Sequence, residues 1–222
     1  MGQVIYLEER RTERSRAALT SRPLFFFDVS CPLSYLTAER IERKLGEVEW
    51  VPVNGASLGS PAMGGEHHRR QDHPPDAPAS RSRAESWAAA LRLPLVWPDR
   101  FPRAPRCAQR ASTFACEIGA GAGFALAAMR LAFCGGFDLD EPETLAEAAA
   151  AAGVPLGECL SAAGETWRDE ELEGNAEVLR EQGVRELPAI RIGNRWFQGQ
   201  AGLLTAGAVI PGSETVRRLA PG

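Results

Sequence analysis

The stretch that decides the fold is Phe25-Phe26-Phe27-Asp28-Val29-Ser30-Cys31-Pro32-Leu33-Ser34-Tyr35-Leu36. Its aromatic start predicts a buried strand, and the residues from Pro32 onward predict a helix. Proline is favoured at the first helical position, because the N–H that it lacks would have no helical partner there. Cys31 therefore falls at the N-cap of this helix, where the partial positive charge of the helix end favours a thiolate.

Cys31 and Ser34 are the catalytic candidates of this stretch. Ser34 stands where a Cys-x-x-Cys motif has its second cysteine, so the motif offers a single thiol. An ordinary thiol has a pKa of about 8.5, and a helix N-terminus lowers this value by about one unit. Hydrogen bonds from Ser34 or from backbone N–H groups lower it further. We therefore predict that Cys31 is reactive; the alternative is an inert cysteine that packs as a small apolar side chain.

The composition is that of a globular protein, with 222 residues, of which 44% are hydrophobic and 24% are charged. The formal net charge of −4 argues against a nucleic-acid partner. Residues 1–22 form a charged extension without the apolar core of a secretory signal. No run approaches the roughly 18 apolar residues that span a membrane, so we expect no membrane partner and a cytoplasmic location.

The cysteines and histidines suggest no metal site. Five cysteines are an odd number, and no two of them have the spacing of a zinc site or of a disulfide framework. Free thiols suit a reducing cytoplasm. Residues 54–83 are rich in Gly, Pro, Ser and Arg and predict a long loop. His67, His68 and His73 lie in this loop without the spacing of metal ligands, so we predict that they are solvated.

The rest of the chain predicts an α/β fold in which a sheet of four strands is split by a large helical insertion. Strands at 24–28 and 50–53 flank a helix from Pro32 to Leu45 that ends at Gly46, which favours a parallel βαβ unit, and Pro52 indicates a sheet edge. Two strands around Gly193-Asn194 predict an antiparallel hairpin. The predicted helices of the insertion are 84–93, 107–133 with a break near Gly119 to Gly123, 141–152, 155–163 and 167–182.

The chain resembles the family that contains 2-hydroxychromene-2-carboxylate isomerase, the kappa-class glutathione transferases and the DsbA-like oxidoreductases. Residues 26–36 resemble the family's Phe-Asp-x-x-Ser-Pro-Tyr-Ser-Tyr-Leu opening, and residues 87–102 resemble a segment inside its helical insertion. Residues 183–190 resemble the stretch Gly-Val-x-Gly-Val-Pro-Thr-Phe, which carries a cis-proline. The resemblance covers residues 24–203 and implies a thioredoxin-like fold, βαβ…ββα, with a helical insertion; the insertion match favours the isomerase and kappa-class side.

This resemblance implies a division of the chain. Residues 23–55 and 184–222 would form the thioredoxin-like domain, and residues 56–183 would form the loop and the helical insertion, which acts as a lid. It also implies a homodimer.

The same resemblance implies glutathione as cofactor. In the family, the serine before the proline hydrogen-bonds the glutathione thiol, and Cys31 stands in that place. Leu187, before the expected cis-Pro188, would pair with the glutathione backbone. The turn Gly199-Gln200-Ala201 would receive the γ-glutamyl end, although the acidic residue that the family often has there is missing.

We therefore expect a glutathione-dependent isomerase or transferase of small aromatic or electrophilic compounds, in which a thiolate adds to a conjugated double bond, rotation follows and the thiol leaves. Cys31 would activate glutathione or be the nucleophile itself. The substrate pocket would lie between the lid and the thioredoxin-like domain. Its expected lining residues are Phe25, Tyr35, Asn54, Trp97 and Trp196.

Two other functions stay open. The first is a monothiol oxidoreductase that acts on disulfides through Cys31; because Ser34 cannot resolve a mixed disulfide, it would need an external thiol or a remote cysteine. The second is a binding module without activity.

Overall fold

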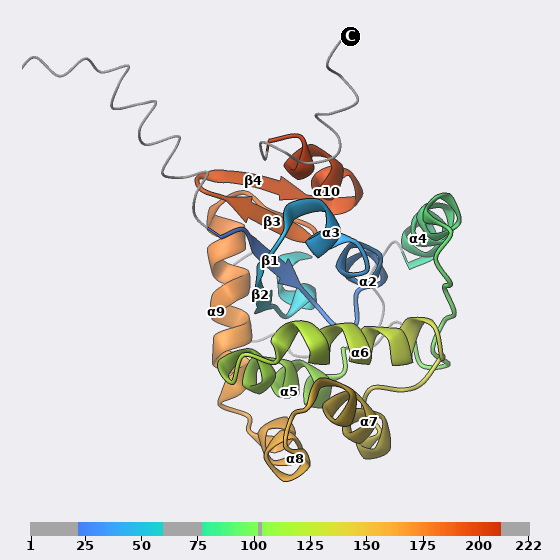
Figure 1. Cartoon of the computed structure of the whole chain (residues 1–222), viewed down its shortest axis with the longest axis vertical. Coiled ribbons are helices and arrows are strands. Elements are labelled where there is room, and N and C mark those ends of the chain that lie inside the picture. The colour runs from blue at the N-terminus through green and yellow to red at the C-terminus, as the bar shows by residue number, and fades with distance from the viewer. Residues whose placement is uncertain (1–21, 60–76, 102–103, 210–222) are drawn as a thin grey trace, which may run out of the picture.

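The computed structural model describes residues 22–59, 77–101 and 104–209, and its core is a four-stranded mixed sheet with the strand order β2-β1-β3-β4 (Figure 1). β1 (Leu24–Phe27) pairs in parallel with β2 (Glu49–Pro52), which lies at one edge of the sheet. The predicted parallel unit and the edge position of Pro52 are therefore confirmed. Among the described residues, none of the helices has the length and hydrophobicity needed to cross a membrane.

The connection between these strands corrects one prediction. In place of a single helix over 32–45, the chain forms α2 (Pro32–Ala38) and α3 (Ile41–Leu45), with Arg40 outside the helical region at φ −131°. Leu36 and Ile41 are both fully buried. In a continuous helix, side chains five residues apart point about 140° away from each other. The break therefore turns both side chains toward the core.

The second half of the sheet is the predicted hairpin. β3 (Ala189–Ile192) and β4 (Arg195–Gln198) are antiparallel, and Gly193 in the turn has φ +57°. β3 also pairs with β1, so the hairpin completes the sheet beside the strand that leads to Cys31. The Leu187–Pro188 peptide bond is cis, as predicted. α10 (Gly199–Gly207) follows directly after β4.

The two faces of the sheet are covered by different helices. Phe26 points to the face on which α9 (Arg168–Glu181) packs through Ala176 and Leu179. Phe25 and Phe27 point to the opposite face, where they pack with Trp50 and with side chains of α2, α3 and α10. This alternation is the period-2 pattern of a strand that is buried on both faces. Phe25, expected in the substrate pocket, is therefore a core residue.

The segment between β2 and α9 is mainly helical, as predicted. It contains the short 3-10 helix η1 (Gly55–Gly59), α4 (Ala77–Leu91), α5 (Arg106–Glu117), α6 (Gly121–Phe133), α7 (Pro142–Ala152) and α8 (Leu156–Gly164). The predicted break between α5 and α6 is confirmed at Gly119, with φ +79°. Residues 77–83, predicted as loop, belong to α4. His67, His68 and His73 lie outside the described residues.

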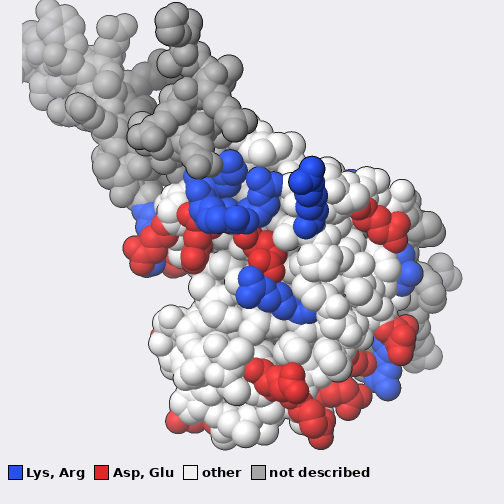
Figure 2. Space-filling model, turned by 45° about the vertical axis from the view of Figure 1, so that its right-hand side comes forward, with Lys and Arg blue, Asp and Glu red and all other residues white. Residues whose placement is uncertain are grey.

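α5 to α8 pack together below the sheet in the view of Figure 1. α9, although it falls within the range predicted as insertion, packs on the sheet. The proposed division into residues 23–55, 56–183 and 184–222 stays a prediction. On the face shown in Figure 2, basic and acidic side chains lie next to each other around a broad uncharged surface.

Ion pairs fasten the start of α9 to α5. The Arg110 guanidinium donates two hydrogen bonds to Asp169, of 2.8 and 2.7 Å. The buried Arg168 pairs with Glu117 and Glu165. Hydrogen bonding to Arg110 lowers the pKa of Asp169 below its usual range. This pairing therefore stabilises the fold above the pKa that Asp169 has in the unfolded chain, and its contribution is lost as the pH falls through the lower pKa of the folded state.

We predict that Asp169→Asn destabilises the protein by about 1 kcal/mol at pH 7, in the range of well-formed, partly exposed pairs. The difference from wild type shrinks as the pH is lowered from 5 toward 3, because the wild-type carboxylate is then protonated as well. Urea unfolding followed by circular dichroism across this range measures the difference. A constant difference over the whole range would contradict the assigned pairing.

Candidate active site around Cys31

Cys31 lies at the N-cap of α2, as the sequence predicts, and faces the loop before β3. Its carbonyl accepts a hydrogen bond from the amide of Tyr35 at 3.1 Å, which closes the first turn. Its Sγ is 4.0 Å from the carbonyl oxygen of Leu187. The structure thus brings together the thiol and the residue before the cis-proline, which are far apart in the sequence. All five cysteines lie in the described part of the chain, and each is a free thiol.

Burial raises the pKa of Cys31 above that of an ordinary thiol. Hydrogen bonding to the side chain and backbone of Ser34 lowers this pKa, and the nearby charge of Asp28 raises it. The net direction is upward, so the prediction of a lowered pKa was wrong. A helix terminus shifts a pKa by about one unit, and at this partly exposed cysteine the desolvation of the thiol outweighs it. Cys31 is therefore a neutral thiol near pH 7.

Asp28 anchors the loop that carries Cys31. Only 3% of this residue is exposed. Its Oδ1 accepts hydrogen bonds from the amide and the hydroxyl of Ser30, both 2.8 Å. Its Oδ2 accepts from the amide of Gly55 at 2.8 Å and from Nε2 of Gln109 at 2.9 Å. Sequence reasoning assigned no role to Asp28, and Gln109 lies on α5 in a helix without any local signal.

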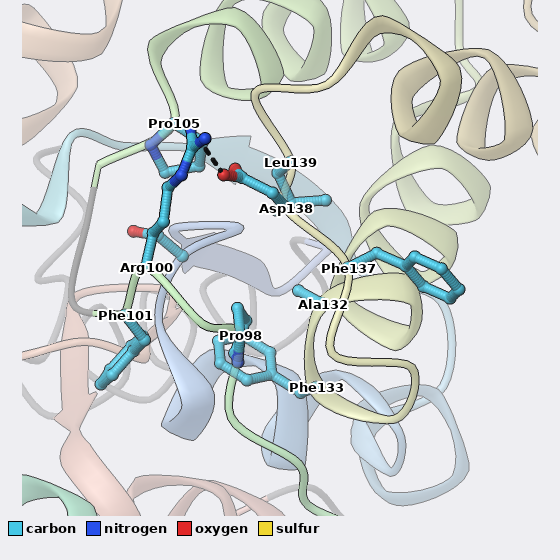
Figure 3. A pocket seen from close by; sticks show the side chains of 10 residues that line it. Pro98, Arg100, Phe101, Pro105, Ala132, Phe133, Phe137, Asp138 and Leu139 are labelled. Atoms are coloured by element: carbon cyan, nitrogen blue, oxygen red, sulfur yellow. Dashed lines mark ion pairs between the residues drawn. The ribbon is translucent and has the colours of Figure 1, made fainter.

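A pocket opens next to this loop, between the loop and the helical insertion. Its cavity volume is about 30 Å³, and it opens to solvent. Figure 3 shows the ion pair of Arg100 and Asp138, 3.2 Å apart, across one side of it, with Phe133 on another. Its lining residues are Ser30, Pro98, Arg100, Phe101, Pro105, Ala132, Phe133, Phe137, Asp138 and Leu139.

None of the four remaining residues expected in the substrate pocket lines this one. Tyr35 and Trp97 each pack against a lining residue of the pocket. The ring centroids of Tyr35 and Phe133 are 5.8 Å apart, and those of Trp97 and Phe101 are 4.7 Å apart. Asn54 is buried and donates to Ser57 and Glu173. Trp196 packs on Phe26, on the α9 face of the sheet. A direct role of these four in substrate binding stays a prediction.

The residues predicted to bind glutathione meet at the start of α10. Gly199, with φ +66°, donates its amide to the carbonyl of Pro188 at 2.8 Å. Gln200 and Ala201 form the first turn of α10, and no side chain caps this helix. The Glu186 carboxylate lies against Gly199, where a side chain at position 199 would collide with its Oε1. Its Oε2 forms an ion pair of 3.3 Å with Arg83 of α4.

Sequence reasoning missed Glu186. A signal was present, because Glu186 stands where the pattern Gly-Val-x-Gly-Val-Pro has its second glycine. Among the described residues, no group of three His, Cys, Asp or Glu side chains is placed to hold a metal ion.

Comparisons with known proteins assign the class. The model of the DSBA-like thioredoxin domain matches residues 24–208, and the chain belongs to this family. Comparison with curated protein sequences gave no match.

Among solved structures, 2-hydroxychromene-2-carboxylate isomerase is similar with a TM-score of 0.68 and 16% identity, covering 90% of this chain and 96% of the other. A probable DsbA oxidoreductase from Streptomyces coelicolor is similar with a TM-score of 0.65 and 17% identity, covering 90% and 92%. A putative protein disulfide isomerase from Nitrosomonas europaea reaches 0.56 with 15% identity, covering 86% and 100%. At these identities the likeness concerns the fold.

We predict that the alkylation rate of Cys31 by iodoacetamide rises with pH to a midpoint above that of a small-molecule thiol, because burial disfavours the thiolate. Ser34→Ala moves the midpoint further up, since the thiolate loses a hydrogen bond. The tryptic peptide that carries Cys31 contains no other cysteine, so mass spectrometry follows this site alone. A midpoint below that of the free thiol would show that the helix terminus outweighs burial.

Proposed function

We propose that this protein is a glutathione-dependent isomerase or transferase of small aromatic or electrophilic compounds. The observation that carries the proposal is the place of Cys31 at the N-cap of α2, directly after Ser30, which lines an apolar, aromatic-lined pocket. A protonated thiol is a hydrogen-bond donor, as a serine hydroxyl is, although a weaker one. Cys31 therefore suits the role of activator better than that of nucleophile, which requires the thiolate.

The residues around Cys31 fit the binding of glutathione. The backbone of Leu187 faces the thiol, and the uncapped start of α10 offers N–H groups to a carboxylate. The Glu186 carboxylate, which pairs with Arg83, lies against Gly199, in the turn where the family's acidic residue is missing. When bound, glutathione would supply the nucleophilic sulfur of the reaction, and the Cys31 S–H would donate to it.

The pocket supports a small and largely apolar substrate. The rings of Phe101 and Phe133 and the side chains of Ala132 and Leu139 form apolar walls. Arg100 and Asp138 are its charged groups, and they pair with each other. Apolar walls with few polar groups are typical of a site for a small molecule.

The second candidate is the monothiol oxidoreductase. It is favoured by the cysteine at position 31 and by two structural neighbours that are described as an oxidoreductase and a disulfide isomerase. Disulfide exchange needs the thiolate of the attacking cysteine. The raised pKa of Cys31 makes this candidate the weaker one.

We predict that Cys31→Ser retains turnover of a 2-hydroxychromene-type compound with glutathione within about tenfold of wild type, whereas Cys31→Ala loses about a hundredfold. The hydroxyl keeps a donor at this position and the methyl group does not. Steady-state kinetics measures both variants. If the protein is the oxidoreductase, both variants lose all activity. The wild type then gains the mass of one glutathione after incubation with oxidised glutathione, and neither variant does.

We predict that Glu186→Gln weakens the binding of reduced glutathione about tenfold, since a charge-assisted hydrogen bond is worth about 1.5–3 kcal/mol. Isothermal titration calorimetry measures the Kd. Glu47→Gln is the matched control, because Glu47 is an exposed carboxylate that pairs with Arg22. Equal affinities of wild type and Glu186→Gln would remove Glu186 from the site.

A further inference from the structure

We infer that Asp28 is the positioning residue of the Cys31 thiol: its buried carboxylate and its main chain fix the loop that carries the thiol, and Gln109 makes this position depend on the helical insertion. The inference concerns the thiol alone. It is therefore independent of glutathione and of the reaction proposed above.

Four donors surround the buried carboxylate of Asp28. They are the amide and hydroxyl of Ser30, the amide of Gly55 and Nε2 of Gln109. A carboxylate is an acceptor with about four acceptor positions. The number of donors therefore matches the capacity of the two oxygens, and the carboxylate is held by groups from three parts of the chain.

The main chain of the same residue holds both ends of the turn that contains Cys31. The carbonyl of Asp28 accepts a hydrogen bond from the amide of Cys31 at 3.0 Å. The amide of Asp28 donates to Oγ of Ser34 at 3.4 Å. Ser34 in turn hydrogen-bonds Cys31. A shift of Asp28 would consequently move the thiol and its hydrogen-bond partner together.

The charge of Asp28 acts on the thiol. A carboxylate close to a thiol disfavours the thiolate, because two like charges would then lie together at a buried site. The charge of Asp28 raises the pKa of the Cys31 thiol, in addition to the larger effect of burial. Desolvation and the fixed charge work in the same direction.

Gln109 brings the helical insertion into this control. It lies on α5, is 1% exposed and donates Nε2 to Asp28, while its Oε1 is buried without a hydrogen-bond partner. A buried, unpaired acceptor costs free energy. The hydrogen bond from Nε2 to the carboxylate of Asp28 offsets this cost, because a carboxylate oxygen is a strong acceptor. The position of α5 thereby affects the charge beside Cys31.

The test is the pH profile of Cys31 alkylation in the full chain, followed by mass spectrometry of its tryptic peptide. Asp28→Asn keeps the shape of the side chain and an acceptor for Ser30. Gln109 can turn its amide to accept from the new amide group, whereas the amide of Gly55 loses its acceptor. We expect the midpoint to fall by about one pH unit, because a like charge is removed. A change in accessibility alone would alter the plateau rate and leave the midpoint in place.

Asp169→Asn is the matched control, because it is the same substitution at a carboxylate that pairs with Arg110. We expect its alkylation midpoint to equal that of wild type. An unchanged or higher midpoint in Asp28→Asn would overturn the inference.

Gln109→Met provides a second variant in case Asp28→Asn fails to fold. It removes the donor from α5 and keeps the charge of Asp28, so we expect the midpoint to rise by a few tenths of a pH unit. A merely structural role of Asp28 would not produce shifts of opposite sign in the two variants. A midpoint in Gln109→Met equal to or below that of wild type would overturn the link to the insertion.

Discussion

The buried carboxylate of Asp28 is the interaction on which the arrangement of the site depends. It joins the end of β1, the loop before α2, the start of η1 and the first turn of α5 through four hydrogen bonds. The first two segments are consecutive in the chain, η1 follows β2, and α5 belongs to the helical insertion. A buried charge is stable only when its acceptor positions are filled. The hydrogen bond between Gln109 and Asp28 therefore fixes where the helical insertion contacts the loop of Cys31.

This arrangement decides which form the thiol takes. The helix end favours the thiolate by about one pKa unit, and burial opposes it by up to several units. With Asp28 close by, the balance favours the thiol. Thiol–disulfide enzymes of this kind of fold need the reverse balance, since the thiolate is their nucleophile. In the proposed function, the same fold would instead use a protonated cysteine as a hydrogen-bond donor.

Most of the fold follows from local signals in the sequence. The aromatic strand, the proline after Cys31, the hairpin around Gly193-Asn194 and the break at Gly119 each depend on backbone preferences that neighbouring residues express directly. The errors arise where tertiary packing decides. The break between α2 and α3 buries Leu36 and Ile41 together. The pocket is lined by Phe101 and Phe133, and aromatic content alone does not distinguish these residues from Trp97 and Trp196. Gln109 acquires its role only through a neighbour 81 positions away.

The two sources of the site suggest how one fold supports different reactions. The loop of Cys31, the cis-proline and the start of α10 come from the sheet and its connections, and they contribute mainly backbone groups. The pocket walls, together with Arg83 against Glu186, come from the insertion and contribute side chains. Backbone geometry persists when the fold is kept, whereas side chains change freely between relatives with 15–17% identity. In the proposed function, the sheet and its connections would therefore supply the groups that act at sulfur, and the helices of the insertion would select the substrate.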